Sequence, residues 1–470
     1  MDSNATNTIT SAGIPAKAVP ARFSKNVATT FVTRIVMVSG GLATSIIVAR
    51  WLGASGLGVL TVINVTVALA VQIGCAGIPS ANTYFISRNR NDLPRAWTNS
   101  MVFALVAGVL ILVALVVITR SRPSMFGVVP VSLITLAAFS IPFQLLTLIG
   151  LNVFLSVGQL NKFNLTDAST QLVLLLNAIL ALILLGFGLG ALVALNTFTM
   201  MLTGSVIAVL VSALVRTVGA VSRRFDWEFF KRTLRYGIKF HICVVAGIVI
   251  IRADLLLVNH FRGSAEAGVY AVAGQMGNLL LLLPGTIATL LFPRVASDPD
   301  PRGDFTARVT RYTAFIMFLI CLAAAAFSFA LPLIYGSAFR PATLQLLILL
   351  PGVYLMAVES VMVQHFTGTG LPGVIPVFWA VCVLFSLTLN VILIPSYGAT
   401  SAAVVSTLTY ALIFVLVAIY FRLKTGNGFA AALLMQRDEM RELLKWLSLS
   451  SSRTYLANNY RTGSDSDRLS

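Results

Sequence analysis

The sequence is poor in charged residues and in cysteine. Of its 470 residues, 10% are charged and 57% are hydrophobic, and the mean hydropathy is +0.90. So few charges could not cover the surface of a soluble protein of this length. Each of the four cysteines lies in a separate apolar run, and none has a CxxC or Cys/His spacing. This pattern favours buried packing thiols over metal ligands or disulfides.

Motifs that mark enzymes and nucleotide users are missing as well. The sequence contains no P-loop, no HExxH and no Gly-x-Ser-x-Gly. The three histidines are too scattered to argue for a metal site. We therefore expect a protein that is not an enzyme and that has no metal or organic cofactor. The possible coupling ions are H⁺ and Na⁺.

What the sequence does contain is a series of apolar runs of membrane length, from about residue 27 to residue 421. They predict an all-α polytopic membrane protein, because a helix satisfies its own backbone hydrogen bonds in lipid. We place about twelve transmembrane helices at approximately 27–49, 58–80, 96–119, 128–155, 164–186, 189–215, 236–260, 267–292, 309–332, 341–366, 373–395 and 398–421.

The net charge of +17 is distributed unevenly between the two sides of these spans. With the N-terminus in the cytoplasm, 26 of the 33 lysines and arginines fall on the cytoplasmic side and 5 on the outer side. This bias predicts a multi-pass protein of the bacterial inner membrane with both termini in the cytoplasm. Contact with anionic membrane lipids accounts for the positive charge without nucleic acid.

Two stretches about 210 residues apart resemble each other. ARWLGASGLGVLTVI aligns with NHFRGSAEAGVYAVA, so that Gly53 falls on Gly263 and Gly58 on Gly268. We infer two six-helix lobes related by a parallel internal repeat. The expected organisation is a disordered N-tail (1–26), an N-lobe (27–215), a basic amphipathic linker (216–235), a C-lobe (236–421) and a cytoplasmic amphipathic helix and tail (422–470).

Charged side chains within spans are costly and so need a reason. Arg34, Arg252 and Lys239 either snorkel to headgroups or face a cavity between the lobes and attract an anionic substrate. Asp254 and Glu359 are either buried charge partners or ion-coupling sites. His365 is a third candidate for ion coupling. The neutral residues predicted to line a sugar path lie in corresponding helices of the two halves: Asn64, Gln72, Gln275 and Asn278.

The box TRIVMVSGGLATSIIVARWLGASGLGVL and the later DLLLVNHFRGSAEAGVYAVAGQM, LFPRVAS, YGSAFRPATLQLLILLPG and NVILIPSYGATSAAVVS together resemble a known family. It is the Wzx-type polysaccharide-lipid flippases of the multidrug/oligosaccharidyl-lipid/polysaccharide exporter superfamily. The resemblance implies a V-shaped, two-lobed bundle with a central cavity. It also implies that an undecaprenyl-diphosphate-linked oligosaccharide is moved to the outer leaflet by alternating access, for exopolysaccharide or O-antigen biosynthesis.

Two other functions are open at this point. One is a proton- or sodium-coupled antiporter of drugs or small molecules with the same fold; a basic cavity argues against it, because cationic drugs prefer acidic sites. The other is a scaffold for a polysaccharide synthase, against which the charges within spans argue. A flippase would have the lipid-linked oligosaccharide as its substrate, with a polysaccharide polymerase or export machinery as a possible partner.

Overall fold

The computed structural model describes residues 21–218, 224–297, 300, 302–368, 370, 372–427 and 439. Most of the expected N-tail and C-terminal tail lies outside these residues. The α-helices are α1 (Ala21–Gly74), α2 (Ile78–Arg88), α3 (Leu93–Ser121), α4 (Val131–Ala138), α5 (Ile141–Ser156), α6 (Leu160–Ala178), α7 (Gly188–Thr217), α8 (Trp227–Arg262), α9 (Ser264–Leu280), α10 (Leu282–Ser297), α11 (Asp304–Ser328), α12 (Leu331–Tyr335), α13 (Arg340–Gly368) and α14 (Val374–Thr425). Short turns of other helix types are η1 (Arg90–Asp92), η2 (Pro123–Phe126), η3 (Ile179–Leu184) and η4 (Ser337–Phe339).

The described residues contain nine helices that are long and apolar enough to cross a membrane. Two of them, α1 and α14, reverse direction at an internal glycine and so supply two spans each. The pair α4 and α5, bent by 41°, makes one further span. Twelve spans result, which confirms the all-α polytopic architecture and the predicted number of helices.

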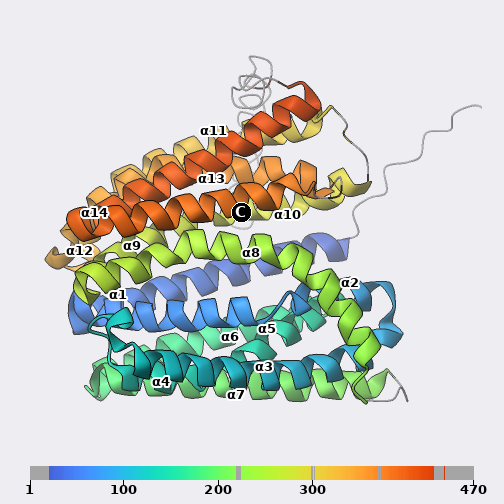
Figure 1. Cartoon of the computed structure of the whole chain (residues 1–470), viewed down its shortest axis with the longest axis horizontal. Coiled ribbons are helices and arrows are strands. Elements are labelled where there is room, and N and C mark those ends of the chain that lie inside the picture. Colours follow the sequence, from blue (N-terminus) through green and yellow to red (C-terminus); the bar gives the residue numbers. More distant parts are fainter. Residues whose placement is uncertain are drawn as a thin grey trace, which may run out of the picture.

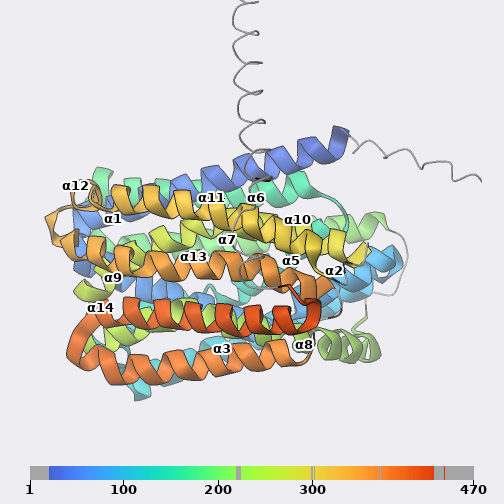
Figure 2. The ribbon, with the colours of Figure 1, turned by 90° about the horizontal axis from the view of Figure 1, so that it is seen from above.

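The helices form two lobes that lie side by side. In Figure 1 the helices α1 to α7 occupy the lower part of the molecule and α9 to α14 the upper part, with α8 between them. Figure 2 shows that the long helices run nearly along the same axis. The lobes meet mainly where α1 packs against α9, which are the two segments that the internal repeat aligns.

Three of the reversals between consecutive spans are each made at a single glycine. Gly53 has φ 68° and ψ −173°, Gly263 has φ 89° and ψ 171°, and Gly398 has φ 66° and ψ −156°. This region of backbone space is open to glycine and strained for residues with a Cβ atom. Gly53 and Gly263 are the glycines that the 210-residue repeat aligned, so the repeated sequence encodes a repeated turn.

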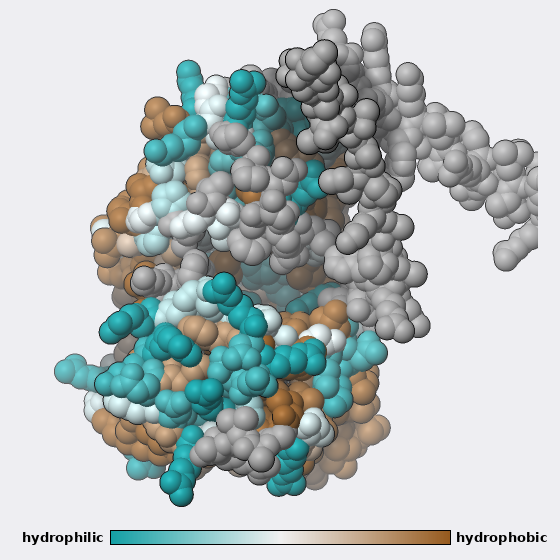
Figure 3. Space-filling model, turned by 90° about the vertical axis from the view of Figure 1, so that its right-hand side faces the viewer, coloured by the Kyte–Doolittle hydropathy of each residue, from teal (hydrophilic) through white to brown (hydrophobic). Residues whose placement is uncertain are grey.

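The two ends of the bundle differ in chemistry. One end, here called the basic end, carries the beginnings of α3, α8 and α11 and many of the arginines. The glycine reversals lie at the other end of the bundle, which we call the opposite end. Figure 3 views the basic end: hydrophilic residues gather over the lower lobe, and a recess separates the two lobes.

Candidate functional site

A small cavity of about 40 Å³ lies between the lobes. The N-lobe supplies Thr61 and Val65 of α1, and the C-lobe supplies the remaining walls. Four residues that the sequence singled out line it together: Arg252, Asp254, Gln275 and Asn278. The other lining residues are Ile251, Leu255, Tyr270, Ala271, Gly274, Gly277, Leu281, Leu349, Val353 and Tyr410. We call this space the interlobe cavity.

Asp254 is the centre of a buried hydrogen-bond network in the interlobe cavity. Its Oδ2 accepts a hydrogen bond from the Tyr270 hydroxyl at 2.5 Å and another from the Ser406 hydroxyl at 2.9 Å. Its Oδ1 accepts from the backbone N–H of Leu255 at 2.7 Å. The side chains come from α8, α9 and α14, so this one carboxyl group joins three helices of the C-lobe. An acidic group buried within a membrane span is costly unless such partners compensate it.

Arg252 behaves differently from Asp254, two residues away. Its side chain is exposed, and within the described part of the chain no ion pair or hydrogen bond holds it. On a helix, two residues correspond to a rotation of about 200°, yet both side chains border the same cavity. The Arg252 guanidinium therefore has N–H donors left for an anionic ligand, while both oxygens of its neighbour Asp254 already accept hydrogen bonds.

A second cavity, of about 220 Å³, lies inside the N-lobe. Asn64 of α1 borders it, together with Ser140, Gln144, Asn196 and Thr197. Gln144 Nε2 donates to Ser140 Oγ at 2.8 Å, and Asn196 Oδ1 accepts from Asn177 Nδ2 at 3.1 Å. These groups are neutral donors and acceptors, the kind that hydroxyl-rich ligands need. Asn64 therefore lies in a different cavity from Gln275 and Asn278.

Arg34 lies apart from both cavities. One of its guanidinium nitrogens is 3.6 Å from Asp167 Oδ2 of α6, and the guanidinium also lies 6.0 Å from the Phe163 ring centre. Its side chain is 48% exposed, so the arginine is paired but still accessible. Asp167 is the single acidic residue within the predicted spans of the N-lobe. That sequence signal could have identified it as the partner of Arg34.

The remaining predicted residues are dispersed. Gln72 contacts Cys75 near the end of α1, with 3.9 Å from Nε2 to Sγ. Glu359 and His365 are buried in α13, 1% and 5% exposed, and neither lines the interlobe cavity. Lys239 belongs to α8, but its side chain lies outside the described part of the structure. Within that part, no three His, Cys, Asp or Glu residues come together as metal ligands.

The lobes are held together at the opposite end. The hydroxyls of Ser55 and Ser264 are 2.9 Å apart. A Cβ atom on Gly58 would lie 1.7 Å from the Ser264 carbonyl oxygen, so the backbones of α1 and α9 are in direct contact there.

Two further sets of contacts close the same end. Arg50 Nε donates to the Ile334 carbonyl at 2.8 Å, and Asn259 Nδ2 donates to the Phe126 carbonyl at 2.8 Å. Each links one lobe to the other. The path between the lobes is therefore shut at the opposite end and recessed at the basic end (Figure 3).

Sequence reasoning missed several residues of these sites. Tyr270, Ser406 and Tyr410 reach the interlobe region from spans that are far apart in the sequence. Hydroxyl residues are common in membrane helices, so no single-sequence signal separates these from their neighbours. Tyr270 is a partial exception, because it lies in the repeated box that the offset of 210 residues identified.

The family model for polysaccharide biosynthesis proteins matches residues 47–344, which is more than half of the chain. The protein belongs to this family. That membership confirms the family that the sequence boxes indicated. Like its flippase and transporter relatives, this protein of the polysaccharide biosynthesis family is not an enzyme. It is a multi-pass membrane protein.

A curated relative of this polysaccharide biosynthesis protein is the probable low-salt glycan biosynthesis flippase Agl15 of Haloferax volcanii. It is 27% identical over 173 residues, which is 36% of this chain and 37% of that protein. The chain thus aligns with little more than a third of the relative's length.

Solved structures share its fold. The lipid II flippase MurJ in an inward closed conformation has a TM-score of 0.69 at 14% identity, covering 86% of this chain and 88% of that one. An inward-facing multidrug resistance MATE family transporter has a TM-score of 0.68 at 15% identity, covering 85% and 98%. At these identities the likeness concerns the fold alone.

Proposed function

We propose that this protein is a flippase for oligosaccharides linked to an isoprenoid diphosphate such as undecaprenyl diphosphate. It would move them from the inner to the outer leaflet of the bacterial inner membrane, for exopolysaccharide or O-antigen assembly. The observation that carries the proposal is the interlobe cavity, in which Arg252, exposed and without a hydrogen bond to the described residues, lies beside Gln275 and Asn278. A cation offers charge-assisted hydrogen bonds to a diphosphate, and neutral amides suit sugar hydroxyls. Family membership and the glycan-flippase relative give independent support.

In the proposed orientation the basic end faces the cytoplasm, together with both termini. The distribution of lysine and arginine in the sequence supports this placement. The recess between the lobes would then open to the cytoplasm, where lipid-linked sugars are made, while the Ser55–Ser264 contact would close the outer side. At about 40 Å³ the cavity holds at most a few water molecules. Substrate entry therefore requires the lobes to separate around it.

We further propose that Asp254 is the group that couples transport to a proton or sodium gradient. Of the three candidates, Asp254 lines the same cavity as Arg252, whereas Glu359 and His365 do not. An anionic substrate approaching Arg252 would change the electrostatic environment of this carboxyl group. Separation of the lobes would also expose the cavity that this carboxyl group borders, while its hydrogen bonds to Tyr270 and Ser406 stay within the C-lobe.

A deletion strain tests the function. We expect it to lose surface polysaccharide and to accumulate lipid-diphosphate-linked repeat units on the cytoplasmic side, with both effects reversed by the wild-type gene. Protection of the accumulated sugars from a periplasmic glycosidase would establish their side. Normal polysaccharide combined with sensitivity to cationic dyes would instead indicate a drug antiporter of the same fold, and would contradict the proposal.

Substitution of arginines tests the site. Arg252→Ala should reduce transport of the lipid-linked sugar about tenfold to a hundredfold, because a charge-assisted hydrogen bond contributes roughly 1.5–3 kcal/mol. Arg120→Ala is the matched control, since Arg120 is an exposed cation at the end of α3 and lines neither cavity. Both variants should reach the membrane in wild-type amounts. Equal transport by Arg252→Ala and wild type would remove Arg252 from the substrate path.

A further inference from the structure

A third hollow, unrelated to the substrate path, lies at the basic end where α8 begins. Its volume is about 460 Å³. Four cations and two carboxylates surround it, together with one aromatic side chain: Arg95, Lys231, Arg232 and Arg235, then Asp226 and Glu228, then Phe229. The cations outnumber the carboxylates, so the residues that line the hollow carry a net positive charge. We call this space the α8 hollow.

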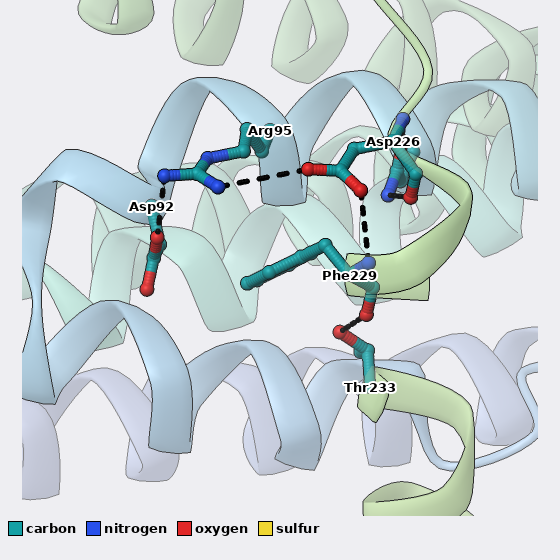
Figure 4. A network of polar contacts seen from close by, with 6 residues as sticks. Asp92, Arg95, Asp226, Phe229 and Thr233 are labelled. Atoms are coloured by element: carbon teal, nitrogen blue, oxygen red, sulfur yellow. Dashed lines mark hydrogen bonds and ion pairs between the residues drawn. The ribbon is translucent and has the colours of Figure 1, made fainter. Parts of the chain in front are cut away.

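The α8 hollow has a fixed framework. Asn99 of α3 holds the backbone of Asp226 by two hydrogen bonds: its Nδ2 donates to the Asp226 carbonyl at 2.8 Å, and its Oδ1 accepts from the Asp226 N–H at 2.9 Å. The Asp226 carboxylate in turn accepts from the N–H of Phe229 at 2.9 Å and caps α8. Figure 4 shows this carboxylate also directed at Arg95. The start of α8 is thus pinned to the N-lobe.

The cations around the hollow are held in place. Arg95 lies between Asp92 and Asp226, with nitrogen–oxygen distances of 3.4 and 3.6 Å (Figure 4). Its Nε–H is buried and has no hydrogen-bond acceptor among the described residues. The Arg232 guanidinium lies 5.1 Å from the Phe85 ring centre and 5.2 Å from that of Phe229. Such cation–π contacts orient a guanidinium while leaving its N–H donors free for an anion.

Two exposed aromatic side chains lie at the start of α8, next in sequence to residues that line the hollow. Trp227 and Phe225 are 56% and 41% exposed, and both rings pack against Phe230. Exposed aromatic residues with polar neighbours are enriched where headgroups meet acyl chains. The Lys231 ammonium lies 5.3 Å from the Trp227 ring centre. A positive hollow and an apolar rim therefore meet at one place on the surface.

From this juxtaposition we propose that the α8 hollow binds the headgroup of an anionic phospholipid. The phosphate lies among Arg95, Arg232 and Arg235, and the acyl chains leave along Trp227 and Phe225. Glu228 and Asp226 keep the net positive charge small, which suits a singly charged headgroup such as phosphatidylglycerol better than a polyanion. A bound lipid would tie the start of α8, which leads into the interlobe cavity, to the bilayer surface.

The test uses the purified full-length protein and native mass spectrometry, with phosphatidylglycerol, phosphatidylcholine and the soluble glycerol 3-phosphate as three separate probes. The hollow variant is Lys231→Gln with Arg235→Gln. The matched control is Arg302→Gln with Lys424→Gln, which removes two exposed cations from the C-lobe side of the basic end. Thermal unfolding of each variant in detergent verifies the fold. If the double variant does not fold, Arg235→Gln alone replaces it.

We expect the wild-type protein to retain phosphatidylglycerol and not phosphatidylcholine. The hollow variant should bind phosphatidylglycerol on the order of tenfold more weakly, because each basic residue near a membrane surface contributes substantially to anionic-lipid binding. The control should stay within about twofold of the wild type. Equal losses in both variants would show general surface attraction and overturn the proposal, as would no loss in the hollow variant. Binding of glycerol 3-phosphate as strong as that of the lipid would assign the hollow to a soluble phosphate compound instead.

Discussion

At the scale of single residues, the buried carboxyl of Asp254 is satisfied by groups from three helices, and this makes it a test of how the C-lobe is held together. Asp254→Ala would leave the hydroxyls of Tyr270 and Ser406 buried without their acceptor. We expect a loss of roughly 2–4 kcal/mol in the free energy of unfolding, against about 1 kcal/mol for Tyr270→Phe. Chemical unfolding in detergent measures both. The double variant should be less destabilised than the two single effects predict together, since they remove the same contact. Full additivity would contradict this network.

Arg34 and Asp167 allow a sharper experiment, because they separate a structural ion pair from a substrate contact. If the arginine serves only to pair with Asp167 across 3.6 Å, exchanging the two residues as Arg34→Asp with Asp167→Arg should restore the transport that Arg34→Asp alone removes. If Arg34 attracts the diphosphate, as its charge within a span suggested, the exchanged variant stays impaired. We expect the second result, because the half-exposed guanidinium has donors left over for an anion. Lipid-linked sugar export in the deletion strain provides the measurement, and full rescue by the exchange would contradict a substrate role.

At the scale of elements, the reversals between spans depend on glycine, and two of them differ in a way that can be measured. Gly53 and Gly398 share positive φ values near 67°, so alanine at either position is strained by about 1–3 kcal/mol. A Cβ atom at Gly53 meets nothing within 4 Å, whereas at Gly398 it would lie 2.0 Å from Glu266 Oε1. That oxygen accepts the N–H of Ala399 at 2.6 Å. Gly398→Ala should therefore lower the melting temperature clearly more than Gly53→Ala. Equal losses would mean that backbone strain alone governs both turns.

The same elements show what the sequence could and could not predict. The lengths of the apolar runs predicted twelve spans, and the 210-residue repeat marked Gly53 and Gly263 as equivalent positions, because these signals are local or periodic. The helix partners of a side chain carry no such signal. Asp254 was identified from its charge, but nothing in the sequence points to Ser406, 152 residues away, as its partner. Gln72 and Asn64 were grouped with Gln275 by position in the repeat. The structure places them in separate surroundings, because the cavity that Asn64 borders lies inside the N-lobe and the cavity that Gln275 borders lies between the lobes.

At the scale of the whole molecule, the proposed alternating access requires two states, and the structure gives one of them. The lobes touch through α1 and α9 at the opposite end, while at the basic end a recess lies between them beside the place where α8 packs on the N-lobe. A substrate larger than the cavity of about 40 Å³ can pass only if the contact between Ser55 and Ser264 breaks. The close backbone approach at Gly58 and Gly268 makes this contact tight, and the hydrogen bonds that cross it at this end come from side chains such as Ser55, Arg50 and Asn259. Such an interface suits a joint that opens and closes as two rigid bodies.

A reversible cross-link at this joint tests the opening movement directly. In a background without the four native cysteines, Ser55→Cys with Ser264→Cys places two thiols where hydroxyls now lie 2.9 Å apart. Oxidation should join the lobes and abolish export, and a reducing agent should restore it, because the locked protein cannot expose its cavity at the opposite end. Each single-cysteine variant serves as a control for the oxidant and should remain active. If the oxidised double variant transports at the wild-type rate while gel mobility shows that the disulfide is complete, the lobes do not separate here. The substrate would then have to leave by another route, and the proposal of alternating access around the interlobe cavity would be wrong.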